Sequence, residues 1–138
     1  MGLAVGQTAH RELTVTESIV SSYAEITGDY NPLHFDPEFA SRTRYRRLIA
    51  QGGITTGLLH ALVAMDMPGP GSVFINQMWN FTRPVYIGDT IRAQATVKSV
   101  HDRRPESQIE FVVENQSGEE VLNGVATVYQ VQSRPPSQ

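Results

Sequence analysis

The chain has 138 residues, a net charge of -3 and no cysteine, and its composition is 40% hydrophobic and 18% charged. This length suits one domain with one core. The negative charge excludes a general attraction to nucleic acid or to an anionic membrane. The lack of cysteine excludes disulfides, thiolate metal sites and a cysteine nucleophile. No secretory signal and no membrane-spanning stretch is recognisable, so we expect a soluble, cytoplasmic protein.

The first half of the sequence predicts short helices. Residues 1–8 have the pattern of a loose lead-in, and the alternation over residues 12–16 predicts a short strand. Thr16 is suited to cap a helix that Gly28 can end in a left-handed conformation. Asp36 followed by Pro37 is typical of a helix start and predicts a second, short helix through Arg42.

An apolar helix is predicted over residues 54–67, directly after Gln51-Gly52-Gly53. Its apolar residues occur nearly all round the helical wheel, so we expect burial on most sides, as inside a wrapping sheet. The paired glycines allow close backbone approach at the helix start, where free N–H groups favour a partly negative oxygen.

The second half alternates apolar and polar residues and predicts antiparallel strands. The glycine- and proline-rich residues 68–71 separate them from the apolar helix, and the tail, residues 133–138, is expected to be disordered. The whole chain, 1–138, then reads as a single α+β domain. The predicted strands cover residues 72–81, 90–100, 109–114 and 121–131.

One short segment, residues 28–34, combines an acid with an imidazole. Asp29 and His34 are five positions apart, and Asn31-Pro32 between them predicts a turn that stops any helix and brings the two together. A carboxylate beside an imidazole suits proton transfer near neutral pH. The alternative is that Asp29 caps a turn and His34 only packs beside it.

Two further features each allow two interpretations. Arg42, Arg44, Arg46 and Arg47 place four of the ten arginines within six residues. They suit either a solvated loop or a contact with a ligand phosphate, because guanidinium geometry matches phosphate oxygens. His60, on the apolar helix, is either a hydrogen-bonded core histidine or part of a site.

Three blocks together resemble the MaoC-like, (R)-specific enoyl-CoA hydratases of the hydratase 2 type. They are Tyr23 with residues 27–34 and Ala40, then Gly52 through Ala61, then residues 81–85 with Gly88-Asp89. The resemblance extends from about Val5 to Val131. It implies the hot-dog fold, an antiparallel sheet wrapped around one long helix. It also implies an acyl-CoA substrate, a role in fatty acid metabolism, and a homodimer or a hexamer.

The resemblance also implies roles for individual residues. Asp29 and His34 match the pair that holds a water and adds it to a trans-2-enoyl thioester. Gly52, with Gly53 beside it, matches the backbone donor to the thioester oxygen, and Asn31 matches a residue that orders the turn. His60 falls where some members have a small polar residue near the water.

The sequence departs from the family at two positions beside the thioester oxygen. Many members have histidine where this chain has Gln51, and a bulky residue where it has Gly53. These departures bear on acyl preference more than on the reaction, and the short chain favours short or medium acyl groups.

Two other functions remain as alternatives: a hot-dog acyl-CoA thioesterase, and a non-catalytic acyl-CoA binding protein. The motifs of this sequence require no cofactor and no metal. The substrate carrier is either CoA or an acyl carrier protein, for which the arginines are the only concentrated basic region.

Overall fold

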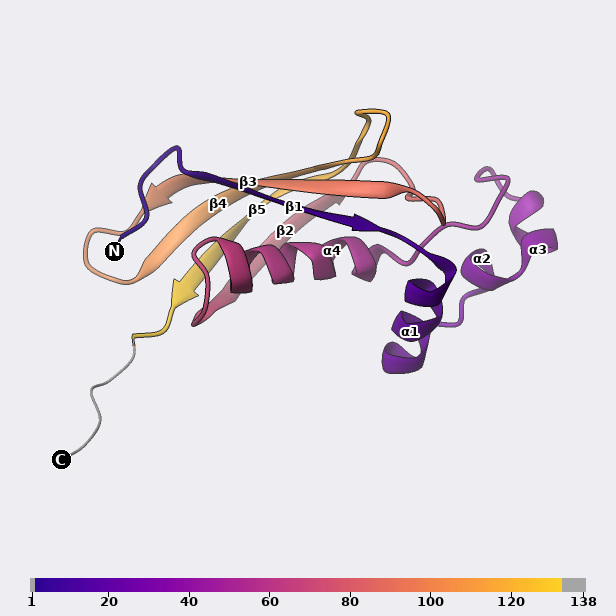
Figure 1. The fold of residues 1–138 in the computed structure, drawn as a ribbon, viewed down its shortest axis with the longest axis horizontal. Helices are drawn as coiled ribbons and strands as arrows, with labels where there is room; N and C mark the ends of the chain where they lie inside the picture. Colours follow the sequence, from indigo (N-terminus) through magenta and orange to yellow (C-terminus); the bar gives the residue numbers. More distant parts are fainter. Residues whose placement is uncertain (1, 133–138) are drawn as a thin grey trace.

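A computed structural model describes residues 2–132, and the predicted disordered tail lies outside the described residues. Five strands form one antiparallel sheet in the order β1-β3-β4-β5-β2, and the helix α4 lies across one face (Figure 1). This is the α+β arrangement that the sequence predicts. The strands are β1 (Thr8–Thr14), β2 (Ser72–Phe81), β3 (Thr90–Val100), β4 (Glu106–Glu114) and β5 (Glu120–Gln130).

The strands largely follow the predicted alternation, and β2 and β3 have the predicted bounds. Along β3, Ile91, Ala93, Ala95 and Val97 are buried in the core. The prediction for β1 was wrong at its start, because this strand begins at Thr8 and not at residue 12. Its polar first half shows little alternation, but it pairs with β3 along its whole length, from Thr8 opposite Thr96.

The central helix α4 (Gly52–Ala61) continues into a π-helical turn (Leu62–Asp66). Leu58, Leu59 and Leu62 are buried in the core. The expectation of burial on most sides was wrong, because the sheet covers only one side and leaves His60 and Met65 exposed. Among residues 2–132, no helix has both the length and the apolar character needed to cross a membrane.

Three short helices lie beyond the N-terminal end of α4 (Figure 1). The first, α1 (Glu17–Thr27), has the predicted caps: Thr16 Oγ1 accepts from the Ile19 N–H at 3.2 Å, and Gly28 has φ +81°. Its inner face is formed by Val20 and Ala24, whereas Ile26 is 84% exposed. The other two helices are α2 (Pro32–Phe35) and α3 (Pro37–Ser41).

The helix α2 corrects the prediction that Asn31-Pro32 stops any helix. Asn31 is instead the N-cap, since its side-chain oxygen accepts from the Leu33 N–H at 3.1 Å. Proline is well tolerated in a first helical turn, where its missing N–H would have no partner. Asn31-Pro32 therefore begins a helix, whereas α1 has already ended at Thr27 with Gly28 as its C-cap.

Candidate active site

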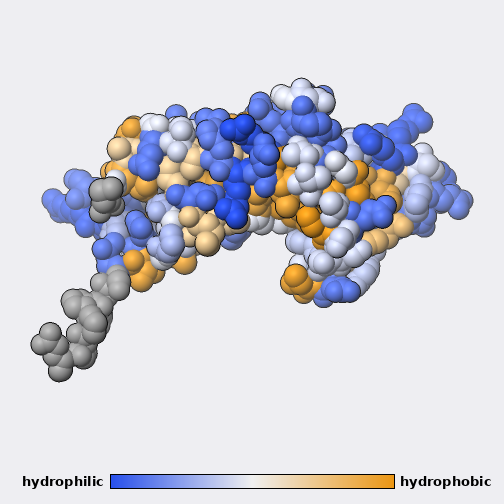
Figure 2. Space-filling model, viewed as in Figure 1, coloured by the Kyte–Doolittle hydropathy of each residue, from blue (hydrophilic) through white to orange (hydrophobic). Residues whose placement is uncertain are grey.

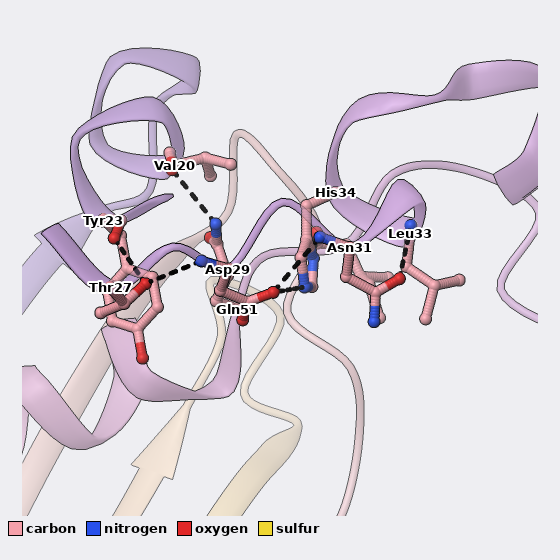
Figure 3. Close-up of polar contacts among 9 residues, drawn as sticks. Val20, Tyr23, Thr27, Asp29, Asn31, Leu33, His34 and Gln51 are labelled. Carbon is pink, nitrogen blue, oxygen red and sulfur yellow. Dashed lines mark hydrogen bonds and ion pairs between the residues drawn. The ribbon is translucent and has the colours of Figure 1, made fainter. Parts of the chain in front are cut away.

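The turn between α1 and α2 brings Asp29 and His34 together. The distance from His34 Nε2 to Asp29 Oδ1 is 3.9 Å (Figure 3). This exceeds the length of a direct hydrogen bond, which is about 3.2 Å at most for such a pair. A water oxygen held between the two groups could bond to both. The two side chains thus face a common point, as the sequence predicts.

The ring of His34 is held by a backbone carbonyl from a distant segment. Its side chain is 8% exposed, and Nδ1 lies 2.7 Å from the carbonyl oxygen of Ile49. A carbonyl oxygen only accepts hydrogen bonds, so Nδ1 carries the hydrogen. In the neutral ring, Nε2 is then an acceptor, and it is the atom that faces Asp29.

The carboxylate of Asp29 is more open, with its side chain 41% exposed. The Asp29 N–H donates to Thr27 Oγ1 at 3.2 Å, and Oδ1 accepts from the Asn31 N–H at 3.3 Å. Asn31 therefore donates to Asp29 through its backbone while its side chain caps the helix that carries His34. One residue orders both halves of the pair.

The segment that holds His34 also leads into α4. The Ile49 N–H donates to the Leu33 carbonyl at 3.1 Å, and the Ala50 N–H donates to the Val85 carbonyl at 2.7 Å. Ile49 also forms an antiparallel bridge with Tyr86. Because Gly52 follows within three residues, the start of α4 is tied to the same segment as the imidazole.

The N-terminal end of α4 is open to a ligand. Gly52 and Gly53 are its first two residues, and the side chain of the N-cap residue, Gln51, forms no capping hydrogen bond. The free N–H groups of a helix start attract a partly negative oxygen. A cavity of about 220 Å³ adjoins this end, lined by Gly52, Ile49, Thr55, Phe81, Arg44 and Arg83 among others.

His60 lies away from this pair. It is exposed on α4, and its Nε2 is 2.9 Å from the side-chain nitrogen of Gln77. It follows Gly52 by eight residues, which is about 12 Å along a helix. The structure therefore does not bring His60 to the N-terminal end of α4.

The four clustered arginines do not act as one group. Arg42 pairs with Glu38 at 2.9 Å, and Arg47 lies over the Tyr86 ring at 3.8 Å from its centre. Arg44 alone reaches the cavity at Gly52, whereas Arg46 and Arg47 line a separate cavity.

Sequence reasoning missed Arg83 as a cavity residue and Asp89 as a support. Asp89 is buried, and its carboxylate accepts from the Tyr86 N–H at 2.9 Å and from Gln116 Nε2 at 3.0 Å. It therefore holds the strand segment against which residues 49–50 pack. Both residues belong to the third sequence block, residues 81–85 with Gly88-Asp89. The position of this block beside the second block was the feature of the sequence that could have pointed to them.

Solved structures of similar architecture define the fold class. The (R)-hydratase from Aeromonas caviae superposes with a TM-score of 0.89 at 31% identity, covering 94% of this chain and 98% of that one. An R-hydratase from Pseudomonas aeruginosa gives 0.87 at 30% identity, covering 99% and 92%. The predicted hot-dog fold is thereby confirmed.

The chain belongs to the MaoC-like family, whose domain model, described as MaoC like domain, matches residues 4–121. The 3-hydroxybutyryl-CoA dehydratase of Methylorubrum extorquens is 38% identical over 126 residues, which are 91% of this chain and 80% of that protein. The (R)-specific enoyl-CoA hydratase of Aeromonas caviae is 32% identical over 126 residues, 91% and 94% of the two chains. The resemblance stated from three sequence blocks is confirmed.

The bond to Ile49 predicts the tautomer of His34. In the neutral ring, nitrogen NMR should show hydrogen on Nδ1 and none on Nε2, because the carbonyl holds that hydrogen. His10 is exposed and should exchange between tautomers in the same spectra. A His34 spectrum like that of His10 would contradict the geometry.

Proposed function

We propose that this protein adds water to the double bond of a trans-2-enoyl-CoA to give a (3R)-3-hydroxyacyl-CoA, and catalyses the reverse dehydration. The observation that carries the proposal is the Asp29–His34 pair, 3.9 Å apart on the segment that is bonded to Ile49, three residues before α4. The names of the hydratase and dehydratase relatives support the same reaction. The equilibrium of the substrates sets its direction.

The pair suits the activation of water. A water between Asp29 Oδ1 and His34 Nε2 donates one hydrogen to each, which leaves a lone pair free to attack the β-carbon. As the new C–O bond forms, the pair takes one proton, with Asp29 as the base. The electrons of the double bond move onto the thioester oxygen, and the pair then returns a proton to the α-carbon.

The thioester oxygen becomes negative during this addition and needs donors. We assign this role to the N–H of Gly52, with Gly53 beside it, because the side chain of the N-cap residue, Gln51, forms no capping hydrogen bond at that end of α4. A donor aimed at a developing oxyanion is typically worth about 10²–10³-fold in rate. Asn31 supports the pair by ordering the turn. The role near the bound water that the resemblance implies for His60 stays a prediction.

One assay separates this function from the two alternatives. With crotonyl-CoA, a hydratase removes the absorbance of the conjugated enoyl thioester without releasing thiol, and chiral analysis of the product tests the (R) assignment. A thioesterase releases free thiol. A binding protein changes neither signal, although a medium-chain enoyl-CoA must be tried before that conclusion.

Asp29→Asn and His34→Ala should each lower the turnover of crotonyl-CoA by at least about 10²-fold while the fold stays intact, because each removes a proton-transfer group. Circular dichroism would check the fold. The matched controls are Asp102→Asn and His101→Ala, since His101 and Asp102 also lie close together, at 3.6 Å, but in an exposed loop. Near-normal turnover in either site variant would overturn the assigned pair.

We further propose that the arginines near the cavity hold the phosphates of CoA, with Arg44 as the main contact. Arg83 already contacts Glu119 at 3.7 Å and the Glu120 carbonyl at 3.0 Å. Arg44 donates to Tyr45 at 3.2 Å and has no carboxylate partner among residues 2–132. Its guanidinium is therefore available to a phosphate.

Arg44→Ala should raise KM for crotonyl-CoA by about 10-fold, the loss of one charge-assisted hydrogen bond, and leave kcat within about twofold. The pantetheine thioester lacks those phosphates, so its KM should change little. Arg103→Ala, in a remote exposed loop, is the control. An equal rise in KM for both substrates would return Arg44 to a surface role.

We propose that two copies join through β2, which is an edge strand of the sheet. Four large apolar residues along β2 are exposed: Val73, Ile75, Met78 and Phe81. An edge of this kind pairs readily with another strand. Phe81 also lines the cavity at Gly52, so the joined edge would extend to the active site.

Light scattering should give twice the chain mass for the wild type. Ile75→Lys with Met78→Lys should give monomers, because two buried charges would have no partner at the new interface. Val5→Lys, at an exposed apolar residue away from β2, should leave the dimer intact. A monomeric wild type at micromolar concentration would contradict the proposal.

The remaining expectations stay predictions: short or medium acyl groups, a cytoplasmic location, no cofactor, and one hot-dog domain over the whole chain. An acyl carrier protein as the thioester carrier also stays a prediction. Its acidic surface would have to meet the cavity that Arg44 lines.

A further inference from the structure

Gly53 allows an unusually close approach between α1 and α4. A Cβ atom at residue 53 would overlap the hydroxyl oxygen of Tyr23. That hydroxyl therefore occupies the place where any other residue type would have its first side-chain atom.

The hydroxyl of Tyr23 lies beside the N-terminal end of α4. In an α-helix, each Cα–Cβ bond is tilted toward the helix N-terminus. An atom in the Cβ position of the second residue, Gly53, therefore lies close to the free N–H groups of the first turn. A hydroxyl placed there adds a donor to the end of α4 at which the N-cap residue, Gln51, forms no side-chain capping hydrogen bond.

The helix that carries Tyr23, α1, is bonded to Gln51, one residue before α4. Gln51 is 1% exposed, and its side-chain nitrogen donates to the Val20 carbonyl of α1 at 3.1 Å (Figure 3). Val20 is three residues before Tyr23 and so lies on the same side of α1. The Tyr23 ring also packs on the core. These contacts limit the movement of the ring relative to α4.

The hydroxyl of Tyr23 forms no hydrogen bond with any of residues 2–132, although the Tyr23 carbonyl accepts one from Thr27. The amide oxygen of Gln51 is buried and also without a partner in that part of the chain. Its amide orientation is determined by Val20, whose carbonyl requires the nitrogen. Two side-chain groups near the N-terminal end of α4, the Tyr23 hydroxyl and the Gln51 amide oxygen, therefore form no hydrogen bond within residues 2–132.

We propose that Tyr23 is a further catalytic residue, whose hydroxyl donates a hydrogen bond to the thioester oxygen at the start of α4. This assignment rests on the proposed hydration. The donation strengthens as the oxygen becomes negative, so it lowers the barrier more than it aids binding. Gly53 is the residue that makes room for this donor.

Tyr23→Phe removes only the hydroxyl and keeps the packed ring. With crotonyl-CoA it should lower kcat and kcat/KM together by about 10-fold or more and leave KM within about twofold, as for a donor used in the transition state. The matched control is Tyr129→Phe on β5, which removes a hydroxyl from another half-buried tyrosine. Its turnover should equal that of the wild type.

A spectroscopic measurement separates donation from packing. The CoA thioester of para-dimethylaminocinnamic acid absorbs at longer wavelength when its carbonyl is polarised. The shift on binding should be smaller for Tyr23→Phe than for the wild type and for Tyr129→Phe. A merely structural tyrosine would leave this shift unchanged.

The outcomes distinguish the two proposals. A wild type that does not consume the enoyl thioester would overturn the proposed function, and the catalytic role of Tyr23 with it. A wild type that turns over, with Tyr23→Phe equal to Tyr129→Phe in kcat and in the spectral shift, would overturn the role of Tyr23 alone.

Discussion

The hydrogen bond from His34 Nδ1 to the Ile49 carbonyl, at 2.7 Å, is the contact on which the site depends. It determines which nitrogen of the ring carries hydrogen and which faces Asp29. It also joins the helical segment to the backbone that leads into α4. Without that carbonyl, no hydrogen bond to Nδ1 would fix the orientation of the buried ring, and Nε2 would no longer be held toward Asp29.

The sheet supports this contact from behind. Residues 49–50 are bonded to residues 85–86, and buried Asp89 holds that second segment through the Tyr86 N–H. Backbone hydrogen bonds therefore join the three sequence blocks. The first block carries the Asp29–His34 pair, the second begins α4, and the third holds residues 49–50, which lie between the other two. Figure 2 shows apolar surface, coloured orange, near α4 and α1.

Prediction from the sequence succeeded where the causes are local. The caps of α1 follow from Thr16 and Gly28 themselves, and the alternation of β3 is complete within eleven residues. It failed for β1, whose first half is held by pairing with β3, and for α2, where Asn31-Pro32 begins a helix instead of stopping one. The burial of α4 was overestimated because composition alone does not tell which face the sheet covers.

By itself, the sequence determined the fold class, the family and the pairing of Asp29 with His34, because turn residues and alternation act between near neighbours in the chain. Only the tertiary structure decided the orientation of His34, since its partner Ile49 is fifteen residues away. It also separated Arg44 from Arg46 and Arg47, and it put the Tyr23 hydroxyl against Gly53. Such contacts depend on how distant segments pack, which spacing along the chain does not encode.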